Sequence, residues 1–506
     1  MLFRSDQAGI PGPVYNFSHD RFIQGIYSTV FKNAPAGFYY TGDPGFPARK
    51  GINARLLQFA PRLGFAWDVT GNGRTSLRAS YAFGYAFVPG DWREDTSGSI
   101  PWGGRVSVAS PPANQFVGGA LDAPWKGLSN PYPIVFDRNA PFLPRGQYKS
   151  DPLNLTNPQT YSWNLSLQHQ IAGNWLASAS YIATRTLHIW TMNAINPAVF
   201  IPGTCSAGQF GLTAPGPCST AANLDARRIL SLERPIDGDK IGPLGQMDDG
   251  GYSTYHAMLL SLERRAARNL TFGTNYTLSH CIGPFTPTQI LKLSPDATYS
   301  KPADRDFDRG NCLSDRRQVF TFSAVAETPQ FSNSLLRKLG SAWKVSPLYR
   351  FSSGQPLDVV SGVDSALNGV TLGSSNSTLR QRPNQVLENP YLDGSARPYT
   401  QWVNSAAFMQ PAPGSYGNVG YDALVGPHTW SFDAALSRTF NIREMQRIEV
   451  RVEAFNVLNS FRPGCAPSAT GCPTGGVNTT LNSNTFGQIR NALDPRIMQF
   501  ALKYAF

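Results

Sequence analysis

The feature that most constrains this chain is a stretch of about ten residues in which apolar and polar side chains alternate. In the segment TYSWNLSLQ, for example, Tyr161, Trp163 and Leu165 alternate with Ser162 and Asn164. A period of two places successive side chains on opposite faces of a β-strand. The alternation resumes after the short turn IAGN, and two such stretches joined by a few residues predict an antiparallel hairpin.

The same unit recurs along the chain, and its repetition determines the fold class. Ten predicted strands form hairpins and one stands alone at the end, while QGIYSTVF (residues 24–31) is a candidate twelfth strand. The eleven are residues 61–69, 75–87, 160–170, 175–190, 253–265, 269–280, 317–327, 342–354, 429–440, 446–459 and 496–506. The sequence therefore predicts an all-β antiparallel protein.

The predicted connections alternate in length. Links within hairpins are mostly short, whereas links between hairpins are long and rich in Gly, Pro, Asn and Ser: residues 89–159, 190–252, 281–316, 354–428 and 460–485. Short periplasmic turns and long external loops are typical of outer-membrane β-barrels. No run approaches the roughly 18 apolar residues of a transmembrane helix, and only a closed sheet otherwise pairs every backbone group in lipid. We expect a transmembrane β-barrel whose last strand is paired on both sides.

The six cysteines support this topology. They fall into three near-neighbour pairs, and each pair lies within one predicted external loop. No pair has the CxxC spacing of a zinc site, and three local disulfides in an oxidising compartment are the simplest interpretation. Free buried thiols are the alternative, and six cysteines allow fifteen connectivities. The pairs are Cys205 with Cys218, Cys281 with Cys312, and Cys465 with Cys472.

Aromatic placement favours a membrane protein over a soluble sandwich. Trp163, Trp175, Trp190 and Trp430 lie near the ends of apolar faces, where an interfacial girdle is expected. The net charge of +11 is scattered in short clusters such as LERRAAR and SDRRQ, without a continuous basic stripe. Nucleic acid is therefore not an expected partner, and the charges suit loops that face lipopolysaccharide and other anionic outer-membrane lipid.

Seven segments together resemble the C-terminal half of the Oar-like TonB-dependent receptors, outer-membrane barrels abundant in acidobacteria. They run in the family's order across residues 33–506, nearly the whole chain. The segments are NAPAGFYYTGDPG, FAPRLGFAWDVTGNGRTSLRASYAFGYAF, YSWNLSLQHQI, STYHAMLLSLERR, FDRGNCLSDRRQVF, RIEVRVEAFNVLN and FGQIRNALDPRIMQFALKYAF. The resemblance implies location in the cell outer membrane and uptake of an unknown small solute, driven by a TonB complex acting on a plug.

The final strand resembles the outer-membrane assembly signal, in which alternate hydrophobic residues lead to a C-terminal Phe. Phe500, Leu502, Tyr504 and Phe506 occupy those positions. The resemblance implies that the barrel-assembly machinery is a partner that reads this strand. An ordinary apolar strand that ends here by chance is the alternative.

The front of the sequence departs from the family. Members carry a signal peptide, a carboxypeptidase-regulatory-like domain and a plug before the barrel, and none of these is visible here. Eleven or twelve strands are also about half of the 22 in plugged transporters. We expect residues 1–60 to be a partial strand and loop at a truncated end, and residues 61–506 to be the C-terminal half of the barrel. The sequence thus predicts a truncated gene product, a fragment or a mis-called start.

The stretch ADRDFDRGNCLSDRR is the one candidate for a metal site. Asp304, Asp306, Asp308 and Asp315 have offsets reminiscent of a calcium loop, but Arg309 stands where that loop needs Gly. Acid–base pairing where a loop re-enters the barrel is the favoured interpretation, so no metal or cofactor is expected. The sequence has no GxSxG or HExxH motif, and an enzyme is not expected.

Solute contacts are expected from aromatic residues of the external loops. The candidates are Trp92, Trp102, Trp125 and Tyr252, with loop packing as the alternative role of each. Two other functions compete with solute uptake: a plug-less surface barrel in adhesion or secretion, and a secreted β-rich carbohydrate-binding protein. Dependence on detergent would exclude the second of these rivals.

Overall fold

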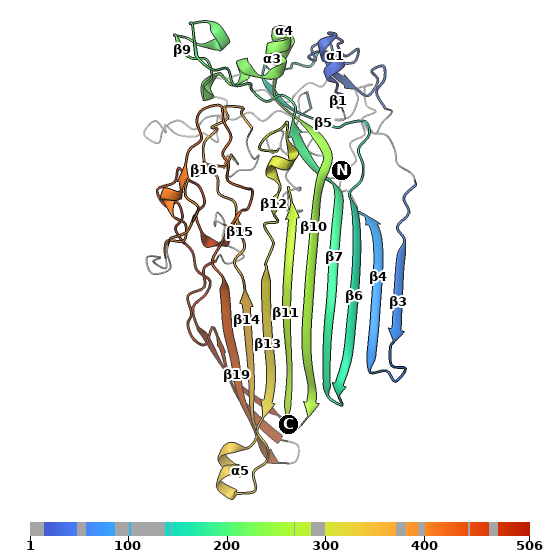
Figure 1. Ribbon diagram of the computed structural model, residues 1–506, viewed down its shortest axis with the longest axis vertical. Coiled ribbons are helices and arrows are strands. Elements are labelled where there is room, and N and C mark those ends of the chain that lie inside the picture. Colours follow the sequence, from blue (N-terminus) through green and yellow to red (C-terminus); the bar gives the residue numbers. More distant parts are fainter. Residues whose placement is uncertain are drawn as a thin grey trace.

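A single large antiparallel sheet dominates the computed structural model of this protein (Figure 1). The structure describes residues 15–47, 57–86, 101–102, 137–142, 144–267, 269–284, 299–370, 381–392, 400–443, 446–464 and 474–506. All eleven predicted strands are present, which confirms the all-β prediction. They are β3 (Arg62–Asp68), β4 (Thr75–Tyr85), β6 (Gln159–Ala172), β7 (Trp175–Ala194), β10 (Ile241–Ala267), β11 (Leu270–Gly283), β13 (Gln318–Glu327), β14 (Trp343–Ser352), β19 (Thr429–Arg443), β20 (Gln446–Phe455) and β21 (Ile497–Ala505).

These eleven strands, which we call the wall, are joined in chain order by antiparallel pairing from β3 to β21. Two short strands extend the sheet: β5 (Gly146–Ser150) pairs parallel to the start of β10, and β12 (Gly310–Asn311) pairs with the end of β11. Among the described residues no helix is long and apolar enough to cross a membrane.

The register carries the alternation of each strand across the whole wall. One row of directly paired residues is Trp67, Leu77, Leu167, Ala179, Leu260, Tyr276, Phe320, Phe351 and Trp430. The adjacent row, on the opposite face, is Asp68, Ser76, Gln168, Ser178, Ser261, Asn275, Thr321, Arg350 and Ser431. A slip of one residue in any strand would exchange the two faces, so the pattern specifies the register. The wall therefore has one apolar face and one polar face.

The apolar face is not covered by the rest of the described chain. Phe500 and Leu502 of β21 are 74% and 73% exposed, and Leu63 of β3 is also exposed. Leaving one such side chain in water forgoes about 1.5 to 3 kcal/mol relative to burying it. A face made of many of these residues is suited to contact with hydrocarbon.

The two ends of the wall differ (Figure 1). Short turns join the hairpins at one end, where the longest link contains α5 (Ser334–Gly340), capped by the Asn333 side chain. In the turn between β3 and β4, Gly71 and Gly73 have positive φ values of 68° and 72°, which non-glycine residues rarely adopt. The described parts of the long links lie at the opposite end (Figure 1).

The described parts of the long links are folded rather than extended, and together with residues 15–47 we call them the external cap (residues 15–47, 101–102, 137–142, 144–158, 187–252, 284, 299–316, 353–370, 381–392, 400–428, 456–464 and 474–496). Its strands are β1 (Tyr15–Phe17), β2 (Phe38–Tyr40), β8 (Thr204–Cys205), β9 (Gly216–Pro217), β15 (Pro356–Leu357), β16 (Asn384–Gln385), β17 (Phe408–Met409) and β18 (Leu424–Val425). Its α-helices are α1 (His19–Ile23), α3 (Ile229–Glu233) and α4 (Pro235–Gly238). Its 3₁₀ turns are η2 (Gln209–Gly211), η3 (Ala221–Asn223), η4 (Asp225–Arg227), η6 (Arg305–Asp308), η7 (Ser405–Ala407) and η8 (Thr474–Gly476).

The edges of the wall correct one expectation. Within the described residues, β3 and β21 each pair with a single neighbour, so the last strand is not paired on both sides. Because the number of strands is odd, both edge strands run toward the short-turn end. Direct pairing of β3 with β21 would be parallel, so an all-antiparallel closure requires an odd number of additional strands.

The predicted twelfth strand is wrong. Residues 24–31 form turns and loop, because the Asp43 carboxylate accepts hydrogen bonds from Ser28 Oγ at 2.6 Å and from the Thr29 amide at 2.6 Å. Such side-chain bonds compete with a strand ladder. Instead of a partial barrel strand, this region contributes β1 and β2, which form a separate two-stranded sheet in the external cap.

The predicted tryptophan girdle needs one correction. Trp175 begins β7 at the short-turn end, and Trp430 lies at the opposite end of β19. Trp190 is buried, because β7 continues into the external cap. There its Nε1 donates to the Thr156 carbonyl at 2.5 Å, and its ring belongs to a small apolar cluster with Met247.

Candidate functional site in the external cap

An aromatic core organises the first part of the cap and includes one predicted solute contact. The Trp102 ring stacks on Tyr15 with centroids 5.8 Å apart and lies 5.6 Å from Tyr40. Both tyrosines are almost fully buried. Trp102 thus has a packing role in the structure, while Trp92 and Trp125 lie outside the described residues.

Tyr252, the fourth predicted contact, lies on the cap portion of β10. Its hydroxyl donates to Asp306 Oδ1 at 2.9 Å. Burial, reinforced by the Asp306 carboxylate, raises the pKa of Tyr252 above its ordinary value. The phenol therefore stays protonated and serves as a hydrogen-bond donor throughout the physiological pH range.

A second polar group is connected to this one through η6, because Arg305 directly precedes Asp306. The Asp248 carboxylate binds the Arg305 guanidinium and accepts a hydrogen bond from the Tyr299 hydroxyl at 2.9 Å. Burial and the Asp248 charge both raise the pKa of Tyr299. Arg305 keeps about half of its side chain exposed, at 52%, so it presents a positive charge at the cap surface.

Behind this surface lies a buried ion pair. Arg382 Nη1 is 2.5 Å from Asp308 Oδ1, and both side chains are only 2% exposed. The remaining guanidinium nitrogens donate to the carbonyls of Phe307 and Val419, at 2.6 Å and 2.7 Å. The ion pair joins η6 to the long loop between β14 and β19, and its two residues are 74 positions apart in the sequence.

The calcium candidates do not converge on one point. Asp304 pairs with Lys301, Asp306 accepts from Tyr252, Asp308 pairs with Arg382, and Asp315 accepts from the Cys281 amide at 3.0 Å. In the described part of the chain, no three metal-ligating side chains gather into a possible cation site. The four carboxylates act as separate hydrogen-bond and ion-pair acceptors.

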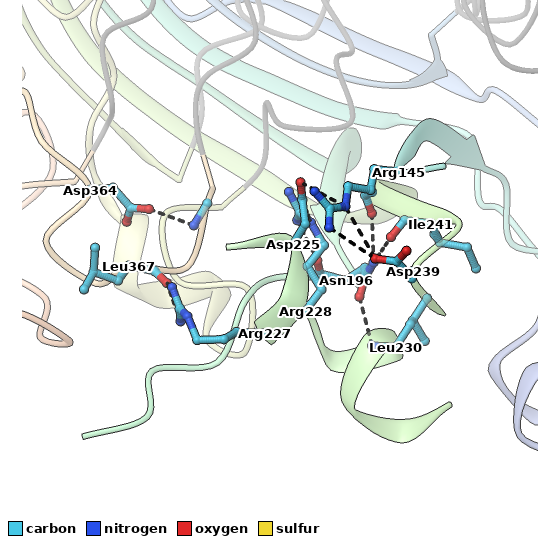
Figure 2. Close-up of polar contacts among 12 residues, drawn as sticks. Arg145, Asn196, Asp225, Arg227, Arg228, Leu230, Asp239, Ile241, Asp364 and Leu367 are labelled. Atoms are coloured by element: carbon cyan, nitrogen blue, oxygen red, sulfur yellow. Dashed lines mark hydrogen bonds and ion pairs between the residues drawn. The ribbon is translucent and has the colours of Figure 1, made fainter. Parts of the chain in front are cut away.

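Figure 2 shows how two polar side chains connect other parts of the cap. Arg227 is completely buried, and its guanidinium donates to the carbonyls of Val199, Thr220 and Leu367. Because Leu367 belongs to the loop between β14 and β19, this contact joins two loops that are 140 residues apart. Backbone carbonyls that have no other partner are costly to bury, so the guanidinium stabilises the contact.

Asn196 performs a similar role beside it (Figure 2). Its Nδ2 donates to the carbonyls of Ile241 and Gly242, at 3.1 Å and 2.8 Å, and its Oδ1 accepts from the Leu230 amide at 3.0 Å. The side chain thus ties the start of β10 to α3. Sequence reasoning missed Arg227, Asn196 and Arg382, because nothing in their local sequence indicates partners so distant in the chain.

Two cysteine pairs are bonded in the structure. Cys205 and Cys218 join the β8–β9 hairpin, with Cα atoms 4.9 Å apart, and Cys281 joins the end of β11 to Cys312, with Cα atoms 5.3 Å apart. Cys465 and Cys472 lie outside the described residues. Both bonds lie in or beside the external cap and close its loops.

Taken together, these contacts make a cap in which buried hydrogen bonds and ion pairs fix the loops that carry the polar groups of the surface. Hydrogen-bond donors and acceptors fixed on a rigid frame bind a polar molecule with less ordering cost than mobile groups. A two-faced antiparallel wall with short turns at one end and such a cap at the other defines the class of outer-membrane barrel proteins. The chain belongs to the family described as Outer membrane beta barrel domain, which matches residues 12–499, and it is located in the outer membrane.

Solved structures with a similar fold include transporters and receptors of the outer membrane. The transporter YddB from Escherichia coli has a TM-score of 0.41 and 11% identity, covering 88% of this chain and 40% of that one. The siderophore receptor PirA from Acinetobacter baumannii has a TM-score of 0.37 and 9% identity, covering 88% and 41%. The ferripyoverdine receptor of Pseudomonas aeruginosa has a TM-score of 0.37 and 8% identity, covering 89% and 33%. The chain thus spans less than half the length of these proteins, and a comparison with curated proteins gave no match.

Proposed function

We propose that this chain forms the wall and external cap of an Oar-like, TonB-dependent receptor that takes up a scarce solute across the outer membrane. The observation that carries the proposal is that one chain combines a wall with a polar face and an external cap that is held together by buried charged side chains. A wall alone would serve a passive pore, whereas a rigid polar cap provides a place to capture a solute before it passes.

The polar face of the wall supports a barrel interior that holds water or a polar protein segment rather than lipid. Ser178 Oγ lies 2.6 Å from Ser261 Oγ, and Ser180 Oγ donates to Ser166 Oγ at 2.8 Å. Hydroxyl side chains on such a surface can exchange hydrogen bonds with water or with a polar protein segment. A plug inside the wall would contact this face, and the TonB complex would act on that plug to gate passage.

The cap supports a polar solute. Tyr252 supplies a protonated phenol, Asp306 a carboxylate and Arg305 a half-exposed guanidinium. Donors, acceptors and both signs of charge suit a solute with several polar groups, whether a siderophore, a saccharide, a peptide or cobalamin. Trp92 and Trp125 remain proposed contacts from the loop between β4 and β6, and the alternating residues of β21 remain the proposed signal for the barrel-assembly machinery.

The test is uptake by cells that carry the gene in its natural context, compared with cells from which it is deleted. The panel contains labelled ferric siderophores, oligosaccharides, peptides and cobalamin. We expect uptake of one class to be lost on deletion and to be abolished by a protonophore, because TonB delivers energy from the proton gradient. Unchanged uptake of every class would reject the proposal and favour the rival role in adhesion or secretion.

A variant locates the capture site. Arg305→Ala removes the half-exposed charge, and we expect it to raise the KM of uptake about tenfold while leaving the amount of receptor in the membrane unchanged. Lys301→Ala, which removes another exposed cation of the same loop, is the matched control. Equal KM values for the two variants would exclude this part of the cap as the capture site.

A further inference from the structure

A groove of about 470 Å³ lies where the wall meets the external cap. One side is formed by the loop end of the wall, through Phe351, Gln318 and His428, and the other by Tyr391 and Trp402 of the loop between β14 and β19. Its volume is within the range of ligand pockets, roughly 300 to 1,000 Å³.

The groove opens on the apolar face of the wall. Phe351 belongs to the apolar row, in which it pairs with Phe320 and Trp430. The His428 side chain lies against it, with ring centroids 5.9 Å apart. The groove thus lies on the same side of the wall as the surface assigned to lipid, opposite the polar face.

The loop side of the groove presents apolar ring surfaces. Trp402 Nε1 donates to the Val425 carbonyl at 2.9 Å, and the Tyr391 hydroxyl accepts from the Val425 amide at 2.7 Å. These bonds satisfy the polar atoms of both rings, and their carbon faces line the groove. The backbones meet closely at its base, because a Cβ on Gly354 would lie 1.7 Å from the Gly426 carbonyl oxygen.

Positive charge stands next to the groove. The Arg316 guanidinium donates to the Gln355 side chain, and the Gln355 carbonyl accepts from the Gly426 amide at 2.8 Å.

We infer that this groove binds an acyl chain of an anionic outer-leaflet glycolipid, with the phosphorylated head group beside Arg316. The inference follows from continuity with the lipid-facing surface and from the sign of the adjacent charge. It depends on the outer-membrane location and is independent of solute uptake, so a negative uptake experiment leaves it intact.

The first test measures lipid retained by the purified full chain in detergent micelles, with bisphosphorylated lipid A as the probe and native mass spectrometry as the readout. Val425→Glu places a carboxylate in the groove, and we expect at least tenfold weaker retention. Val386→Glu is the matched control, because Val386 lies in the same loop but outside the groove and is similarly exposed, at 48% against 45%. Equal loss in both variants, or none in either, would overturn the proposal.

Two further measurements keep the inference testable if Val425→Glu does not fold. Arg316→Gln is expected to weaken retention of bisphosphorylated lipid A about fivefold but not that of its dephosphorylated form. In the unmodified chain, lipid A with a photoreactive acyl chain is expected to label the peptides around Phe351, Trp402 and Val425. Labelling spread evenly over the apolar face would show ordinary boundary lipid and reject a specific site, and excess inorganic phosphate is expected not to compete.

Discussion

The wall and the external cap of this protein solve opposite problems. In the wall, large apolar side chains such as Phe500 and Leu502 point away from the protein, and the strands are joined by backbone ladders. In the cap, aromatic rings are buried in clusters and charged groups such as Arg227 and Asp308 are enclosed. The wall depends for its stability on the lipid that surrounds it, whereas the cap depends on the packing of its own side chains.

This difference has a physical cause. Hydrocarbon offers apolar side chains the same environment as a protein interior but offers no hydrogen bonds to the backbone. The wall therefore needs complete ladders and no core, and its register sorts residues by face. The cap lies in water, so its long loops gain stability by burying apolar surface and by pairing most of the polar groups that are enclosed with it.

The largest expected effect comes from an enclosed charge of the cap. Arg382→Met leaves the Asp308 carboxylate buried without its partner, and we expect the cap to lose about 3 to 5 kcal/mol of stability. Lys301→Met removes an exposed pair with Asp304 and should cost at most about 1 kcal/mol. Protease susceptibility of the cap in urea measures both. Similar values for the two variants would show that burial does not distinguish cap ion pairs.

The wall is tested by placing the same new charge on its two faces. Leu260→Arg puts a guanidinium on the apolar face, and we expect a cost of about 2 to 4 kcal/mol in lipid. Ser261→Arg puts it on the polar face, in the adjacent position of the same strand, and should cost much less. The folded fraction in vesicles, read from heat-modifiable gel migration across a urea series, gives both values. Equal costs would mean that the face assigned to lipid is wrong.

The two regions also differ in how far the sequence predicts them. The wall follows from local alternation, and predicted strand 317–327 became Gln318–Glu327 because each residue's face depends only on its immediate neighbours. Cap contacts depend on loops that meet across the chain, as Arg227 does with Leu367. No local pattern specifies such a meeting, and the sequence therefore did not decide between a solute contact and loop packing for Trp102, which packs against Tyr15 and Tyr40. The predicted strand at residues 24–31 failed for the same reason, since its competitor is Asp43.

The smallest expected effect concerns pH at the junction of wall and cap. Burial raises the pKa of Asp315 above its ordinary value of 3.8, although the Cys281 amide and nearby cationic groups oppose the shift. The folded state therefore binds this proton more tightly than the unfolded state, and the Asp315 contribution to stability becomes more favourable as the pH falls through the raised pKa toward 3.8. Asp315→Asn keeps an acceptor for the Cys281 amide and removes the titration. We expect the difference in urea midpoint, unmodified chain minus variant, to increase from pH 7 to pH 4. A difference that is constant with pH would show that Asp315 is hydrated like a carboxylate on the protein surface.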